Sequence, residues 1–171
     1  DKYLEKMQQA EYTVVVYVQD EATSGTTRSL SAIYSPGTYF SQTSESITNN
    51  IMSIWIHKIR GRIVFGLSNI DIYTGRSSVF EYDTEFSHYS ISCDELERFV
   101  HIYQPKEVII IHNVENGVLQ TIIQHANFET RCIHLLNCGV NSDNLPRIKN
   151  CEKQVYQVEI YNKYFNHVLP D

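Results

Sequence analysis

The most constraining feature of the sequence is a short run at residues 107–112 whose centre, Val108 to Ile111, is continuously apolar. A run of this length without alternation of apolar and polar residues is typical of a parallel β-strand that is buried on both faces. Parallel strands need long crossover connections, which are usually helices. Apolar residues at helical spacing lie on either side of the run, at 92–105 and 116–125, and another strand-like run follows at 130–135. The sequence therefore predicts alternating helices and strands in this half of the chain.

Upstream, runs rich in β-branched and aromatic residues predict further strands, at 12–18, 28–34, 50–59, 63–73 and 77–82. A short turn that contains Gly75 joins the last two runs and predicts a hairpin. Antiparallel strands that lead into alternating helices and strands predict an α/β fold, with a mixed β-sheet flanked by helices.

The predicted helices have start and stop signals. Ser92 and Glu95 have the spacing of a capping box, and Pro105 ends the pattern that follows them. A short helix is predicted at residues 1–10 and another at 153–168, and the Asn-, Gly- and Pro-containing residues 137–150 are predicted to form a loop.

Composition limits the classes of function. The chain has 171 residues and a net charge of −6, which fits one domain, or one domain and part of another. The acidic balance argues against a free-standing nucleic-acid-binding protein but not against one domain of a larger one. No run approaches the roughly 20 apolar residues of a membrane span, and we expect no secretory signal and an intracellular location whose compartment stays open. The chain starts at Asp1 and ends at Asp171, and we expect it to be a piece of a longer protein.

Catalytic motifs for nucleotide, metalloprotease or serine hydrolase chemistry do not occur in the sequence. Asp71 lies at the end of an apolar strand, where ribonuclease H-like nucleases place a carboxylate, but the later strands supply none except Glu107 at an edge. Two-metal chemistry needs several carboxylates, so the preferred interpretation is that Asp71 orders the hairpin. A nuclease that uses Asp71 remains the alternative.

Two other groups of residues are candidate sites. Lys58, Arg60 and Arg62 surround Gly61 between two predicted strands; they are candidate contacts to a DNA backbone, although a solvated turn is the favoured interpretation. The four cysteines show neither C-x-x-C nor zinc-finger spacing. We therefore expect free thiols, with a disulfide left open, and we predict no metal ion or cofactor for this chain.

The sequence resembles the MutS family of DNA mismatch repair proteins. Four stretches carry the resemblance in the family's order: residues 3–19, Arg28 with 33–38, residues 71–76, and residues 94–110. The most specific is Ile33-Tyr34-Ser35-Pro36-Gly37-Thr38, and another is the hairpin sequence that includes Asp71, Gly75 and Arg76. The family typically has Gly where this chain has Glu11. The residues around 33–40 and 48–51 are similar to the branch of giant viruses and octocoral mitochondria.

The resemblance implies a domain organisation and a role. It places the end of the mismatch-binding domain at 1–40, a linker at 41–47, a ribonuclease H-like connector domain at 48–150 and the start of the helical lever region at 151–171. The connector relays mismatch binding and ATP state between domains and contacts a MutL-type partner. The hinge is then Ser35, Pro36, Gly37 and Thr38.

The resemblance also implies what this chain lacks. We expect it to be non-catalytic and without a cofactor, whereas the parent protein is an ATPase that uses ATP and Mg²⁺, binds mismatched double-stranded DNA and forms a dimer. The alternatives from other classes are the nuclease based on Asp71 and a free-standing binding domain unrelated to repair.

Overall fold

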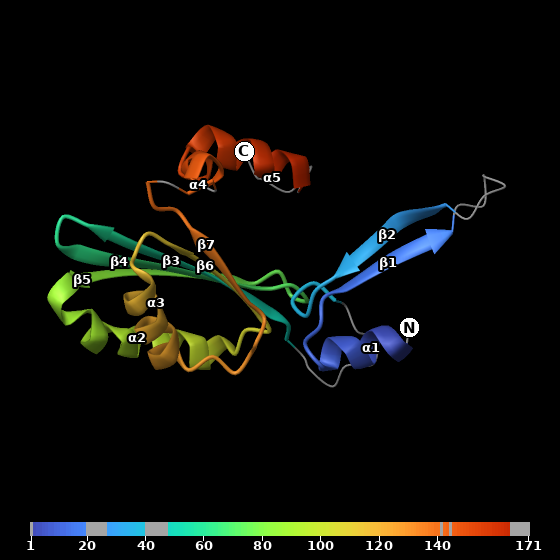
Figure 1. The fold of residues 1–171 in the computed structure, drawn as a ribbon, viewed down its shortest axis with the longest axis horizontal. Coiled ribbons are helices and arrows are strands. Elements are labelled where there is room, and N and C mark those ends of the chain that lie inside the picture. Colours follow the sequence, from blue (N-terminus) through green and yellow to red (C-terminus); the bar gives the residue numbers. More distant parts are fainter. Residues whose placement is uncertain (1, 20–26, 40–47, 141, 144, 165–171) are drawn as a thin grey trace.

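The computed structural model describes residues 2–19, 27–39, 48–140, 142–143 and 145–164. The predicted linker at 41–47 lies outside the described residues. The described strands form two separate sheets, one of two strands near the N-terminus and one of five strands in the middle of the chain. Figure 1 shows the small sheet projecting from one end of the larger one.

The N-terminal unit consists of helix α1 (Lys2–Gln9) and the antiparallel strands β1 (Val14–Gln19) and β2 (Arg28–Tyr34). The buried side chain of Gln8 joins the helix to the hairpin, because its Nε2 donates 2.9 Å hydrogen bonds to the carbonyls of Tyr12 and Tyr34. The predicted strands at 12–18 and 28–34 are confirmed to within two residues.

The larger sheet contains β3 (Asn50–Ile59), β4 (Arg62–Asp71), β5 (Ser77–Glu85), β6 (Glu107–His112) and β7 (Ile133–Asn137). Their spatial order is β5-β4-β3-β6-β7. Strands β3, β4 and β5 are antiparallel neighbours, whereas β6 and β7 run parallel to β3. Numbered within the sheet, this order is 3-2-1-4-5, which is the ribonuclease H-like arrangement. The predicted fold class, a mixed sheet flanked by helices, is confirmed.

Two tight turns connect the antiparallel strands. Between β3 and β4, Arg60 and Gly61 have φ angles of 48° and 79°, as the two central residues of a primed hairpin turn require. Gly75 has φ 71° in the connection between β4 and β5, where a side chain would be strained. The hairpin predicted around Gly75 is therefore confirmed.

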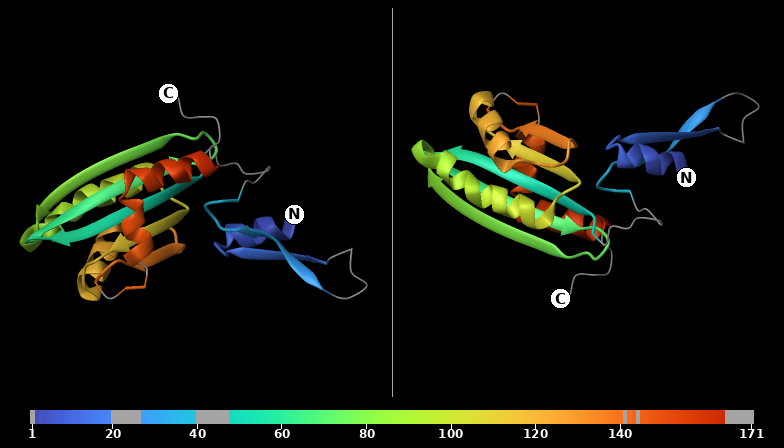
Figure 2. Two further views of the ribbon diagram at one scale, coloured as in Figure 1. Left: turned by 90° about the horizontal axis from the view of Figure 1, so that it is seen from above. Right: turned by 90° about the horizontal axis from the view of Figure 1, so that it is seen from below.

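The core lies between one face of the large sheet and the helices α2 (Tyr89–Tyr103) and α3 (Asn116–Ala126). Alternate residues of β3 point into it, in agreement with the two-residue period of a strand. Figure 2 shows both helices crossing the same face. The fully buried side chains of this core include Met52, Ile54, Ile56, Phe65, Leu67, Leu96, Val108, Ile110, Leu119 and Ile122.

The predicted capping box at Ser92 is wrong. A 3₁₀ turn, η1 (Phe86–His88), leads directly into α2, so the helix begins at Tyr89 and Ser92 lies inside it. The rings of Phe86 and Tyr89 stack with centroids 5.5 Å apart and pack against the core. This packing extends the helix toward its N-terminus. The predicted end is confirmed, since Gln104 adopts a left-handed conformation just before Pro105.

The predicted loop at 137–150 is also wrong in part. Helix α4 (Leu145–Cys151) forms within it, and α5 (Gln154–Tyr164) follows after a break. Pro146 is the second residue of α4, where a proline does not interrupt hydrogen bonding. Figure 1 shows α4 and α5 on the side of the sheet opposite α2 and α3. Helix α4 runs across the expected boundary at residue 150, and the division into domains stays a prediction.

Within the described part of the chain, the helices are all too short or too polar to cross a lipid bilayer.

Candidate functional site

The turn at Ser35–Thr38 packs against the end of the large sheet where β3 and β6 begin. The turn is closed internally, because the N–H of Thr38 donates to the carbonyl of Ser35 (3.1 Å) and the N–H of Ser35 donates to Oγ1 of Thr38 (3.0 Å). The N–H of Gly37 donates to Oε2 of Glu107 across 3.0 Å. The predicted hinge is thus in direct contact with the first residue of β6.

The space at Gly37 admits no side chain. A Cβ atom there would lie 2.6 Å from Oε2 of Glu107 and 2.8 Å from Cγ1 of Ile51. These separations are shorter than van der Waals contact, so the neighbours would have to move. Gly37 does not have a positive φ angle, and the need for glycine therefore comes from close packing of the turn on the sheet.

Asn49 forms a second connection between the turn and the sheet. This buried residue immediately precedes β3, and its Nδ2 donates to the carbonyls of Gly37 (3.1 Å), Pro36 (3.4 Å) and Tyr39 (3.4 Å). Its backbone N–H donates to Oδ1 of Asp71 across 3.0 Å. Asn49 therefore holds the turn through its side chain and the end of β4 through its backbone.

The carboxylate of Asp71 accepts hydrogen bonds from groups around it in the hairpin and from the residue before β3. Besides the bond from Asn49, it accepts hydrogen bonds from the N–H of Tyr73 (3.1 Å) and from Oγ1 of Thr74 (2.6 Å). These donors, with Thr74 the largest contributor and Asn49 next, lower the pKa of Asp71 below its ordinary value. Arg76 closes the same hairpin, since its carbonyl accepts a hydrogen bond from the N–H of Asp71. This geometry agrees with the interpretation that Asp71 orders the hairpin.

The three basic residues considered as DNA contacts lie at the opposite end of β3 from Asn49. The ammonium of Lys58 is 3.6 Å from the ring centroid of Phe86. Arg62 forms an ion pair with Asp83, which raises the pKa of the arginine. Arg60 is exposed in the turn. The structure therefore does not bring these residues to the junction with the N-terminal unit, and their contact with DNA stays a prediction.

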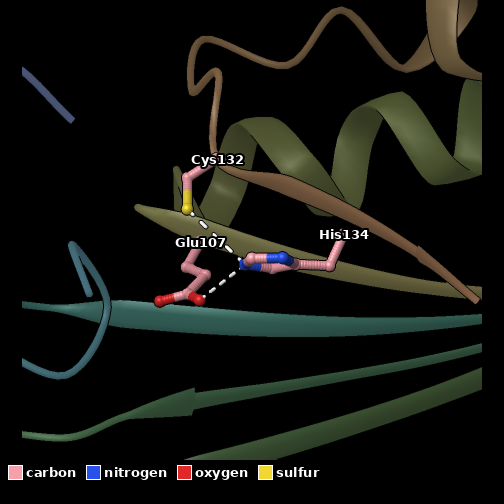
Figure 3. Close-up of side chains that lie close together, drawn as sticks. All are labelled: Glu107, Cys132 and His134. Atoms are coloured by element: carbon pink, nitrogen blue, oxygen red, sulfur yellow. Dashed lines mark hydrogen bonds and ion pairs between the residues drawn. The ribbon is translucent and has the colours of Figure 1, made fainter. Parts of the chain in front are cut away.

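A mixed cluster beside the turn was missed at the level of sequence. Figure 3 shows the side chains of Glu107, Cys132 and His134 close together. Glu107 is the first residue of β6, Cys132 immediately precedes β7, and His134 lies within β7. Nε2 of His134 is 2.8 Å from Oε1 of Glu107, and Sγ of Cys132 is 3.6 Å from the same nitrogen. The side chain of Glu107 is 11% exposed and that of His134 is 49% exposed. The cluster is therefore buried at Glu107, which contacts the turn, and accessible to solvent at His134.

Burial raises the pKa of the Cys132 thiol, and the carboxylates of Glu107 and Glu11 act in the same direction. Glu11 itself forms another contact between the two units, because its Oε2 accepts a 2.9 Å hydrogen bond from the N–H of Arg131. Glu11 has φ 62°, a conformation in which glycine is unstrained. The departure from the expected glycine therefore occurs at a left-handed position, where the glutamate side chain supplies an additional bond.

The pattern that reveals the cluster is a period of two along a strand. Cys132 and His134 alternate with Ile133, so they share one side of the strand, and the pairing of Val108 with Ile133 places Glu107 next to them. The cluster does not have zinc-finger spacing, because its third residue comes from a neighbouring strand.

These elements define the class of structure: a ribonuclease H-like mixed sheet joined at one end to a second unit through a polar contact region. No protein-family model matches the chain. The chain is 29% identical over 120 residues to a mutS homolog of Acanthamoeba polyphaga mimivirus, named as a DNA mismatch repair protein. The match covers 65% of this chain and 11% of that protein, so the chain corresponds to a small part of its relative.

Two solved structures share a weaker likeness. The resolvase of fowlpox virus, in a complex with Holliday junction DNA, is 15% identical and has a TM-score of 0.32, with 68% of this chain and 85% of that chain covered. The intasome of simian T-cell lymphotropic virus is 16% identical and has a TM-score of 0.27, with 71% and 44% covered. These scores are too low to carry any statement about this chain.

Proposed function

We propose that this chain is part of a MutS-like DNA mismatch repair protein and that its large sheet is the connector domain of that protein. The sequence similarity to the mimivirus mutS homolog supports the first statement. The ribonuclease H-like strand order and the preceding hairpin unit support the second. In this proposal the chain itself is non-catalytic, and mismatch recognition and ATP hydrolysis belong to other parts of the parent protein.

The observation that carries the proposal is the contact between the Ser35–Thr38 turn and the large sheet. A relay requires two rigid bodies and a joint that has alternative arrangements. Here the joint is polar: Gly37 is held by Glu107, and the carbonyls around it are held by Asn49. Such bonds can be exchanged for bonds to water when the joint opens, so the loss of each costs only a modest net free energy.

The partners of the parent protein follow from the same proposal. Mismatched double-stranded DNA is bound through the parent, which acts as a dimer, and a MutL-type protein contacts the connector. Lys58, Arg60 and Arg62 are the proposed contacts to the DNA backbone; all three are exposed, and Arg60 lies in the hairpin turn. Because Arg62 is paired with Asp83, it would have to exchange that partner for a phosphate.

The parent protein with a Gly37→Ala substitution tests the relay. The added methyl group displaces the turn from Glu107 and Ile51, so we expect formation of the ATP-dependent sliding clamp on mismatched DNA to slow by about tenfold or more, while mismatch affinity stays unchanged. Gly117→Ala is the matched control, because a Cβ at that position meets nothing within 4 Å. Clamp kinetics equal to those of the control would overturn the proposed role of the joint.

A further inference from the structure

We propose that Glu107, Cys132 and His134 form a zinc-binding site beside the Gly37 turn. Each residue offers one ligand atom, and the three atoms lie within 4.8 Å of one another. Figure 3 shows the sulfur of Cys132 and a carboxylate oxygen of Glu107 both directed toward the same ring nitrogen of His134. This site is independent of the proposed connector role, since it rests only on the geometry of β6, β7 and the turn.

One of the distances between the ligand atoms fits a tetrahedral zinc ion, and a second is shorter. Zinc bonds of about 2.3 Å to sulfur and about 2.0–2.2 Å to nitrogen and oxygen place tetrahedral ligands about 3.3–3.6 Å apart. The separation of Sγ of Cys132 from Nε2 of His134 is 3.6 Å. Nε2 of His134 and Oε1 of Glu107 are 2.8 Å apart, so they would separate by about 0.5 Å when a metal ion replaces the hydrogen bond between them.

The backbone already holds the ligands in place. The N–H of Val108 donates to the carbonyl of Cys132 (2.9 Å), and the N–H of Cys132 donates to Oγ1 of Thr130 (3.1 Å). Because Cys132 adjoins β7 and Glu107 begins β6, the parallel pairing of the two strands fixes the spacing between them. Side-chain rotation of His134 is then sufficient to admit the ion.

The donor set selects the metal. One thiolate, one imidazole and one carboxylate suit zinc, whereas Mg²⁺ and Ca²⁺ prefer oxygen ligands alone. Binding releases the thiol proton of Cys132 to solvent, and the ring proton of His134 moves from Nε2, where it is donated to Glu107, to Nδ1. The three side chains then bond to the ion through S⁻, the unprotonated Nε2 and O⁻. The half-exposed side chain of His134 leaves the fourth position open to a water molecule.

The second oxygen of Glu107 links the metal to the turn. Oε1 faces the cluster, while Oε2 accepts the hydrogen bond from Gly37. A hydrogen bond from a backbone N–H orients a carboxylate that binds a metal. In turn, the bound metal restrains the carboxylate that accepts the hydrogen bond. A bound zinc ion therefore fixes the carboxylate on which the Gly37 turn is seated.

Metal titration of the purified chain tests the site. We expect one Zn²⁺ per chain by calorimetry, and with Co²⁺ as probe we expect a thiolate-to-metal charge-transfer absorption band. Cys132→Ser should abolish the band, and Cys132→Ser, His134→Asn and Glu107→Gln should each weaken zinc binding by roughly tenfold or more. Cys151→Ser is the matched control, because Cys151 is another cysteine of the chain but lies exposed at the end of α4, outside the cluster.

Hydrogen exchange of the unmodified chain, measured with and without Zn²⁺, adds a test that needs no variant. The amide of Gly37 should exchange more slowly when Zn²⁺ is present, whereas the amide of Gly139, which is bonded to Asn137, should not change. The proposal is overturned if Co²⁺ gives no thiolate band with the unmodified chain, or if Cys132→Ser binds zinc as tightly as Cys151→Ser does.

Discussion

Gly37 lies so close to Glu107 that no larger residue fits, and its N–H is bound by the carboxylate of that glutamate across 3.0 Å. The two residues are 70 positions apart in the sequence. Gly37 belongs to the turn that follows the N-terminal hairpin, and Glu107 begins β6, the first parallel strand after the antiparallel strands of the large sheet. This contact joins the two sheets of the molecule at one point.

Removal of the Asn49 side chain should weaken the same junction. Asn49→Ala leaves three backbone carbonyls without their donor, and a buried polar group that loses its partner costs about 1–3 kcal/mol. We expect the free energy of unfolding of the chain, measured by urea titration, to fall by that amount. Asn162→Ala, on the exposed side of α5, should change it by less than about 0.5 kcal/mol. Equal effects of the two substitutions would contradict the role assigned to Asn49.

Acid should destabilise the fold through Asp71. Because the pKa of this carboxyl is lowered in the folded chain from its ordinary value of 3.8, its ionised form is favoured by folding. The stabilisation is present above the unfolded pKa and is lost as the pH falls through the lower folded value. We expect urea midpoints to decrease below about pH 4, and to decrease less in Asp71→Asn.

Asp94→Asn serves as the comparison for this pH series, because Asp94 is exposed on α2. If the acid dependence of Asp71→Asn matches that of the unmodified chain and of Asp94→Asn, the hydrogen bonds around Asp71 do not contribute as described.

A nuclease assay separates the proposed function from its main alternative. Among the described residues, the only group of three potential metal ligands is the one at Glu107, and Asp71 is not in it. Since two-metal cleavage requires several carboxylates around the scissile phosphate, we expect the purified chain with Mg²⁺ or Mn²⁺ to leave DNA and RNA intact. Metal-dependent cleavage that disappears in Asp71→Asn would favour the nuclease instead.

Much of the large sheet could be predicted because its signals are local. The strands at 107–112 and 50–59 have the predicted bounds. Their burial follows from the continuous apolar residues of the first and from the alternating apolar residues of the second. The hairpin between β4 and β5 could be predicted because Gly75 is a residue that tolerates the positive φ angle of its turn. The sequence pattern and the packing agree in these elements.

The errors arose where packing between distant residues decides the structure. Helix α2 begins earlier than its capping signal because Phe86 and Tyr89 pack on the core. In the same way, the cluster at Glu107, Cys132 and His134 forms only when two strands pair in parallel. The seating of Gly37 against Glu107 likewise needs the tertiary structure, although the turn itself was recognised from Ser35-Pro36-Gly37-Thr38.

The most direct test of the proposed relay is a distance measurement across the junction in the parent protein. Labels carried by unnatural amino acids at Leu30 on β2 and Val79 on β5, which are 54% and 81% exposed, avoid the native cysteines. We predict that the separation of the labels on mismatched DNA changes when ATP is added, and that Gly37→Ala suppresses the change while Gly117→Ala does not. A separation that stays the same with and without ATP in the unmodified protein would contradict the account.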